Sequence, residues 1–247
     1  MPINPKIVKN DVDLILWSFR LQLIHRYSHQ RFWERETIEL EHCQRISGKV
    51  FVENVAAHSW HVCDTAMLLQ PHFPHLQMEK LLRLGILHDK LEIITGDDSP
   101  QGKDGKGQNT YAYNQEKRFQ RMRKEGDALS DYINKLPSHC QKGQKEDLLE
   151  LHDLSSEEAL FIKAIDKLQV LAFLYHRKDG QFVDSHLKFT LSYTSKCIEY
   201  FEGLEFHFKE IRMRLLKQVA KSRGISLDAM EKWREQHCKA QLGFKFS

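Results

Sequence analysis

The chain is poor in the residues that break helices. Its 247 residues include only six prolines and twelve glycines. Proline removes a backbone donor and glycine loses the most conformational freedom on folding, so their scarcity favours long helices over many short strands. Strand signals are correspondingly weak. The best of them is residues 49–52, a short run after Gly48 that is equally compatible with extended chain.

Cysteine is also scarce, and its spacing argues against a disulfide framework. No two of the five cysteines form a C-x-x-C pair, and an odd, scattered set indicates free thiols in a reducing compartment. The opening stretch, MPINPKIVKNDVD, is charged and polar, so no secretory signal is expected. Charges break every apolar run well before the roughly 20 residues that span a bilayer. We therefore expect a cytoplasmic globular protein with no membrane partner.

An excess of charge of one sign is lacking as well. The 37 basic and 34 acidic residues leave a net charge of +3, which gives little long-range attraction to nucleic acid. The most basic stretch, residues 209–224, is predicted to be an amphipathic helix with a solvated charged face. Its predicted inward residues are Ile211, Leu215, Leu216 and Val219. We therefore expect no nucleic-acid partner.

The chain does have enough apolar residues for a core. A hydrophobic content of 41% can fill one compact domain. Apolar spacing and end signals predict an all-α fold. The predicted helices cover residues 11–29, 55–69, 78–95, 109–135, 156–177, 185–223 and 227–240, and residues 99–110 are the clearest loop. We expect a single domain over 1–247 with a core at about 40–180 and a helical extension at about 181–247. A boundary near Gly180 is the alternative.

Several details of these helices are also predicted. The expected N-caps are Asn10, Ser155 (in a capping box with Glu158) and Ser226. The first predicted helix carries a row of apolar residues that should face the core. These residues are Val12, Ile15, Leu16, Phe19, Leu23 and Ile24.

Polar residues interrupt an apolar helix in segment 81–94, LLRLGILHDKLEII. The segment predicts a buried helix, yet it contains His88, Asp89 and Glu92. At about 100° per residue, these three residues share one sector of the helix. A carboxylate beside a histidine in an apolar setting is costly unless a cation compensates it. The segment therefore predicts that a cationic group lies beside these residues.

The same pattern recurs at His58 and at Asp166, each of which lies in line with apolar residues on its own predicted helix. A bundle that brings the three helices together would place two imidazoles and two carboxylates around one point. Such nitrogen and oxygen ligands suit one divalent transition-metal ion: Mn, Co, Fe, Ni or Zn. The in-line apolar residues are Val55, Val62 and Leu69 for His58, and Ile162, Val170 and Phe173 for Asp166.

Each of these residues has a simpler interpretation on its own. A lone histidine on an apolar face is usually a core histidine with a backbone partner. Asp166 could form an ion pair with Lys163 or Lys167, and His61, one turn from His58, could approach the same point. The coincidence of four ligand-type residues on apolar helices favours the metal site.

The order His58, His88-Asp89, Asp166 resembles the H…HD…D signature of the HD superfamily of metal-dependent phosphohydrolases. The segments ENVAAHS (53–59), LHDKLEIITGDDSP (87–100) and FIKAIDKLQVL (161–171) are similar to segments of bacterial 5′-deoxynucleotidases and their relatives. The resemblance covers roughly residues 40–175. It implies an HD-domain helical bundle with an N-terminal helix and a C-terminal helical extension.

The resemblance also implies roles for individual residues. It implies that Glu92 acts on the attacking water or the leaving group, and that Asp97 is a second catalytic acid, with the adjacent Asp98 as the alternative. It also implies a homodimer. The metal ligands that it implies are His58, His88, Asp89 and Asp166.

The family's basic residue before the first histidine has no ungapped counterpart, because counting reaches Cys43 and Gln44. A small gap reaches Arg45, which we predict to bind substrate together with Lys49; loop residues Lys103 and Lys106 are weaker candidates. The implied reaction releases phosphate from nucleoside 5′-monophosphates, with deoxyribonucleotides preferred. The alternatives are a dNTP triphosphohydrolase, a cyclic nucleotide phosphodiesterase, a guanosine polyphosphate hydrolase, or a non-catalytic nucleotide-sensing protein.

Overall fold

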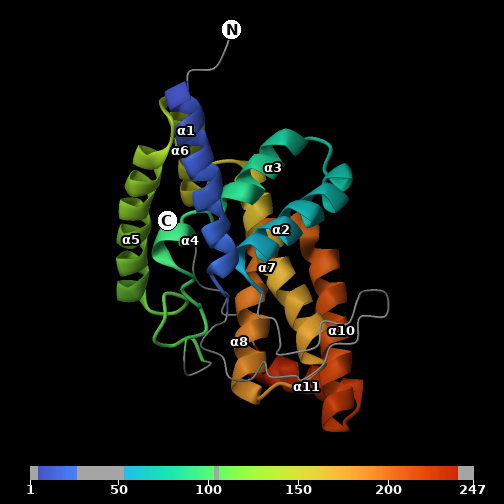
Figure 1. Ribbon diagram of the computed structural model, residues 1–247. Coiled ribbons are helices and arrows are strands. Elements are labelled where there is room, and N and C mark those ends of the chain that lie inside the picture. The colour runs from blue at the N-terminus through green and yellow to red at the C-terminus, as the bar shows by residue number, and fades with distance from the viewer. Residues whose placement is uncertain (1–4, 27–52, 103–105, 239–247) are drawn as a thin grey trace, which may run out of the picture.

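The chain folds into a helical bundle around one long central helix (Figure 1). The computed structural model describes residues 5–26, 53–102 and 106–238. In these residues the only β-type pairing is a single bridge between His25 and Asn54, so the all-α prediction is confirmed. The helices are α1 (Pro5–Ser18), α2 (Val55–Leu69), α3 (Met78–Leu87), α4 (Glu92–Thr95), α5 (Gln115–Lys135), α6 (Ser138–Asp153), α7 (Glu157–Lys178), α8 (Asp184–Thr194), α9 (Lys196–Tyr200), α10 (Glu205–Arg223) and α11 (Leu227–His237). Short 3₁₀ helices η1 (Phe19–Leu23), η3 (Gln70–His72) and η4 (Glu202–Leu204) join them.

Helix α7 occupies the centre because it is apolar on nearly every side. Phe161, Ile162 and Ile165 are fully buried within it. It contacts α2, α3, α6, α8, α9 and α10, and in Figure 1 it runs between α5 on one side and α10 on the other. A helix that is buried all round fixes the position of each of its polar side chains, and Asp166 is one of these.

Helices α2 and α3 pack closely against each other and against α7. A Cβ atom on Gly85 would lie 2.8 Å from the Cys63 sulfur atom, so the missing side chain is what lets α3 approach α2. Leu81 and Leu84 of α3 and Val62 of α2 are fully buried at this contact. The close approach brings the C-terminal end of α3 towards the first turn of α2.

The C-terminal helices share the core of the central helix. Leu215, Leu216 and Val219 of α10 and Met230 of α11 are buried in the same apolar cluster as Phe161. The prediction of an amphipathic helix in the basic stretch is confirmed, with Ile211 packed at the margin of that cluster. No helix in the described part of the chain has both the length and the apolar character needed to cross a membrane.

The structure corrects several details near the N-terminus. Helix α1 begins at Pro5, so Asn10 lies inside it and is not its cap. Most of the predicted inward face is also wrong, because four of its residues are at least 46% exposed: Val12, Ile15, Leu16 and Leu23. Leu14 and Trp17 pack inward instead, against apolar residues of α3, α5 and α6. The 3.6-residue period is present, but the helix has two neighbouring apolar rows, and the row with Leu14 and Trp17 is the one that packs inward.

Other helix boundaries also differ from the prediction. The helix predicted for 78–95 is interrupted at 88–91, and the one predicted for 185–223 is divided into α8, α9 and α10. Ser156, not Ser155, caps α7 by accepting a hydrogen bond from the Ala159 amide. Glu158 accepts from the Gln77 amide rather than completing a capping box. Helix α6 was not predicted, because its sequence is mostly polar.

Candidate metal centre

His58 reaches the interior from the first turn of α2. The Asn54 side chain caps this helix by accepting from the Ala57 amide, and Val55 and Val62 anchor the same helix face in the core. His58 is completely buried. Burial lowers the pKa of His58 to about 4, so its imidazole is neutral at pH 7, as a metal ligand must be.

His88 and Asp89 lie in a tightened turn just after α3. Hydrogen bonds from the Lys90 amide to the Leu87 carbonyl and from the Glu92 amide to the Asp89 carbonyl span three residues instead of four. In such a turn, side chains three apart point the same way, so Asp89 and Glu92 still share a face although the helix is interrupted. His88 Nδ1 donates to the Gly85 carbonyl at 2.7 Å, which leaves Nε2 as the acceptor nitrogen.

Asp166 projects from the middle of α7 towards the two histidines. Its Oδ1 atom lies 3.3 Å from His58 Nε2. Its Oδ2 atom accepts from Lys167 Nζ at 2.6 Å and lies 4.0 Å from Lys163 Nζ. The ion pair that the sequence offered as an alternative role for Asp166 is therefore present, and it coexists with the contact to His58.

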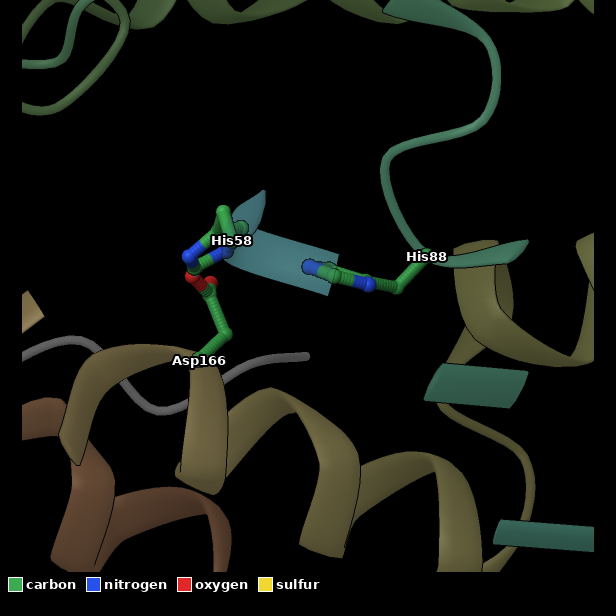
Figure 2. A group of neighbouring side chains, drawn as sticks. All are labelled: His58, His88 and Asp166. Carbon is green, nitrogen blue, oxygen red and sulfur yellow. The ribbon is translucent and has the colours of Figure 1, made fainter. Parts of the chain in front are cut away.

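These residues converge on one point (Figure 2). His58, His88 and Asp166 offer ligand atoms that all lie within 4.8 Å of one another, and the rings of His58 and His88 have centroids 5.1 Å apart. Asp89 Oδ2 adjoins this group, 3.5 Å from His58 Nε2 and 3.3 Å from His88 Nε2. The two Nε2 atoms are buried without a hydrogen-bond partner, although buried polar atoms are normally satisfied.

The electrostatics of the centre keep its two aspartates ionised. Burial opposes ionisation of Asp89, but His88, His58 and Arg26 outweigh it and hold the pKa of Asp89 below its usual range. Lys167 and His58 likewise outweigh burial at Asp166 and lower its pKa. Burial disfavours protonated His88, yet Asp89 raises its pKa. Two ionised carboxylates beside two unpartnered imidazole nitrogens fit a divalent transition-metal ion.

Glu92 and Asp97 lie close to this group. Glu92 Oε2 is shielded from solvent and has no hydrogen-bond partner. Burial, followed by the charges of Asp89 and Asp97, raises the pKa of Glu92 well above its usual value. Asp97 is half-buried and its charge acts on Glu92, whereas Asp98 is exposed. His61 is also exposed, and its ring packs edge-on against the ring of Trp60.

The structure adds Arg26, which sequence reasoning missed. Its guanidinium donates to Asp89 Oδ2 at 2.9 Å and lies 3.4 Å from Glu53 Oε2. The Arg26 amide also bonds to the Glu53 carbonyl, which ties the end of the N-terminal segment to the start of α2. No spacing rule links Arg26 to a histidine 32 positions later. The predicted substrate-binding residues Arg45 and Lys49, and Lys103 of the loop, lie outside the described residues.

A second wall of the centre comes from the loop after Asp98 and from α5 and α8. Lys167 Nζ donates to the Tyr193 hydroxyl at 3.0 Å. The guanidinium of Arg121 lies 3.8 Å from the ring centroid of Tyr111. The described part of this loop is packed at Gly107, which lies against Phe189 of α8 and whose amide bonds to the Gln101 carbonyl. Lys106 is exposed on this loop.

Comparison with known proteins agrees with this geometry. The HD domain family matches residues 31–203, more than half of the chain. The chain therefore belongs to the HD domain family, which confirms the resemblance inferred from its residues.

Relatives of known name are more distant. The chain is 27% identical to 5′-deoxynucleotidase HDDC2 of Bos taurus over 119 residues, or 48% of this chain and 51% of that protein. It is 30% identical to 5′-deoxynucleotidase hdd1 of Schizosaccharomyces pombe over 132 residues, or 51% and 60% of the two chains. These matches span only about half to three fifths of the relatives' length.

A solved structure shares the fold. It is the crystal structure of a protein described as a predicted metal-dependent phosphohydrolase from Magnetospirillum magnetotacticum. The match has a TM-score of 0.61 and covers 88% of this chain and 96% of that one, at 19% sequence identity. At this identity the likeness concerns the fold alone.

Proposed function

We propose that the protein is a metal-dependent phosphohydrolase that removes phosphate from nucleoside 5′-monophosphates, with deoxyribonucleotides preferred. The observation that carries the proposal is the pair of buried, unpartnered Nε2 atoms of His58 and His88 beside Asp89 and Asp166. A divalent ion held by these four residues would supply Lewis-acid chemistry for a phosphoryl oxygen and for a water molecule. The names of the relatives supply the substrate class.

The residues of this chain have distinct roles in the proposal. His58, His88, Asp89 and Asp166 hold the metal. Glu92 exchanges a proton with the attacking water, because burial, followed by the charge of Asp89, raises the pKa of its carboxyl group.

Two further residues prepare the site. Asp97, which lies near Glu92, protonates the leaving 5′ oxygen. Arg26 holds one oxygen of Asp89 and places a positive charge at the edge of the site that receives the phosphate dianion.

Arg45 and Lys49 remain the proposed contacts to the substrate phosphate. Two matched variants, Arg45→Gln and Lys49→Gln, test them. Each should raise KM with little change in the bound metal. A homodimer of such subunits and a cytoplasmic location also remain proposals.

The test is a substrate panel. The four ribonucleoside and four deoxyribonucleoside 5′-monophosphates, together with dNTPs and cyclic nucleotides, are incubated with the protein and Mn²⁺ or Co²⁺. We expect release of inorganic phosphate from the monophosphates, fastest from the deoxy series. Release of triphosphate from dNTPs, or ring opening of cyclic nucleotides, would show that these nucleotides are the substrates and not the monophosphates. No turnover of any nucleotide by the metal-loaded protein would favour a nucleotide-sensing role.

A further inference from the structure

Gln169 connects the candidate metal centre to a second layer of polar residues. It lies on α7, one turn after Asp166, and it is 6% exposed. Its side-chain oxygen is 2.8 Å from His58 Nδ1, and its side-chain nitrogen is 2.6 Å from Glu53 Oε1. Gln169 therefore contacts the nitrogen of the His58 ring that faces away from Asp166.

The partners of Gln169 fix the direction of both hydrogen bonds. An ionised carboxylate only accepts hydrogen bonds, so the amide NH₂ of Gln169 must face Glu53. The amide oxygen then faces His58, and because this oxygen also only accepts, His58 Nδ1 must carry the proton. A neutral imidazole has a single N–H, so the lone pair is on Nε2. That atom is 3.3 Å from Asp166 Oδ1 and 3.5 Å from Asp89 Oδ2.

Glu53 is itself held in place. Arg26 lies 3.4 Å from Glu53 Oε2 and donates to Asp89 Oδ2. The contacts therefore run from His58 through Gln169, Glu53 and Arg26 to Asp89. The approach of Asp89 to His58 closes them into a ring. Most of this ring is buried, because Glu53, His58 and Gln169 are all under 9% exposed.

We propose that Gln169 is a positioning residue of the metal centre, whose amide, oriented by Glu53, holds His58 in the Nδ1–H tautomer and presents Nε2 to the metal. Outer partners of this kind fix the orientation of ligating histidines, and their loss usually costs about 10–100-fold in metal affinity. The amide itself is neutral, and the negative charge of Glu53, 3.7 Å from His58 Nδ1, is offset by Arg26. The inference rests on the proposed metal centre and not on the proposed substrate.

The main test compares wild-type protein with Gln169→Met, which has a similar volume and no hydrogen bond to His58. Affinity for Mn²⁺ is measured by titration calorimetry. In addition, ¹⁵N NMR of histidine-labelled protein, with the His58 signals assigned by their loss in His58→Gln, reports the tautomer. We expect one Nδ1–H tautomer in the wild type, a mixture in Gln169→Met, and Mn²⁺ binding weakened by about 10–100-fold.

Two further variants make the result specific. Glu53→Gln keeps the hydrogen bond but lets both amides turn round, so the His58 tautomers should also mix. Gln144→Met removes the bond between Gln144 and the Tyr132 hydroxyl, outside the metal centre, and should leave the Mn²⁺ affinity and the NMR spectrum of His58 unchanged.

The possible results separate this inference from the proposed function. Mn²⁺ affinity within twofold of wild type and an unaltered His58 tautomer in Gln169→Met would overturn the positioning role. If Gln169→Met does not fold, the same two measurements on Glu53→Gln decide. A wild-type protein that does not bind Mn²⁺ would overturn both ideas. If the Mn²⁺ affinities are as expected but no nucleotide is hydrolysed, only the proposed substrate is rejected.

Discussion

Glu92→Gln is expected to lower kcat by about 10²–10⁴-fold while the metal stays bound. Glutamine keeps the volume of Glu92 and one accepting oxygen, but it cannot take up or release a proton. The pKa of Glu92 is raised by burial and by the charges of Asp89 and Asp97, which suits a group that exchanges a proton during catalysis. General acid–base catalysis contributes about 10²–10⁴-fold, which corresponds to roughly 3–5 kcal/mol of transition-state stabilisation.

The assay measures kcat with the best nucleotide of the panel, and metal content by mass spectrometry of the same samples. Glu79→Gln is the matched control, because Glu79 begins α3, far from His88 along the helix, and pairs on the surface with Arg83. It should match the wild type in both measurements. Full activity of Glu92→Gln would refute the acid–base role. Loss of metal together with activity would instead make Glu92 a group that holds the metal.

Three further predictions concern stability. Chelation of the metal should lower Tm by about 5–10 °C in a thermal scan, because a ligand present at 100 times its Kd contributes about 2.7 kcal/mol; Asp166→Asn should melt at the same temperature with and without Mn²⁺. Burial and the charge of Lys178 lower the pKa of His186 to about 3, so below pH 6.5 the unfolded chain takes up a proton that the native state refuses. His186 should therefore contribute a loss of about 1.4 kcal/mol of stability per pH unit as the pH falls from 6.5 to 3, and His186→Gln should remove this contribution in urea titrations. An equally steep slope in the variant would contradict the assignment. Gly180→Ala should cost well over about 1 kcal/mol, because Gly180 has φ +76° and an added Cβ would lie 2.2 Å from the Gln218 carbonyl oxygen; an unchanged urea midpoint would refute this.

The sequence predicted the elements whose signals are local. Helix α2 begins and ends where its apolar spacing indicates, at residues 55 and 69. The stripes through His58 and Asp166 face the core as expected: Val62 and Ile162 are fully buried, and Leu69 and Phe173 are partly buried at the ends. Apolar periodicity was enough to predict these helices, because α2 has one apolar face and α7 is buried on nearly every side.

Local signals failed where tertiary contacts decide. Helix α1 has two apolar rows, and only packing against α5 and α6 selects the row with Leu14 and Trp17. The turn at 88–91 is also set by its surroundings, because the hydrogen bond from His88 to the Gly85 carbonyl and the contact of Asp89 with Arg26 replace regular helical order.

The prediction of the candidate site succeeded for residues that are close in sequence. It missed residues that come from distant parts of the chain. His88, Asp89 and Glu92 lie within one short segment, so their shared direction could be inferred from helical geometry. Arg26 and Gln169 could not be inferred in this way. Arg26 reaches Asp89 only through the pairing of His25 with Asn54, and Gln169 is one polar residue among several on α7.

The central claim is that His58, His88, Asp89 and Asp166 bind one divalent ion. Anomalous diffraction from crystals grown with Mn²⁺ tests it most directly. We expect one strong anomalous peak about 2 Å from Nε2 of both histidines and from a carboxylate oxygen of each aspartate. A peak bound by other residues, or a peak that leaves either histidine uncoordinated, would contradict the claim.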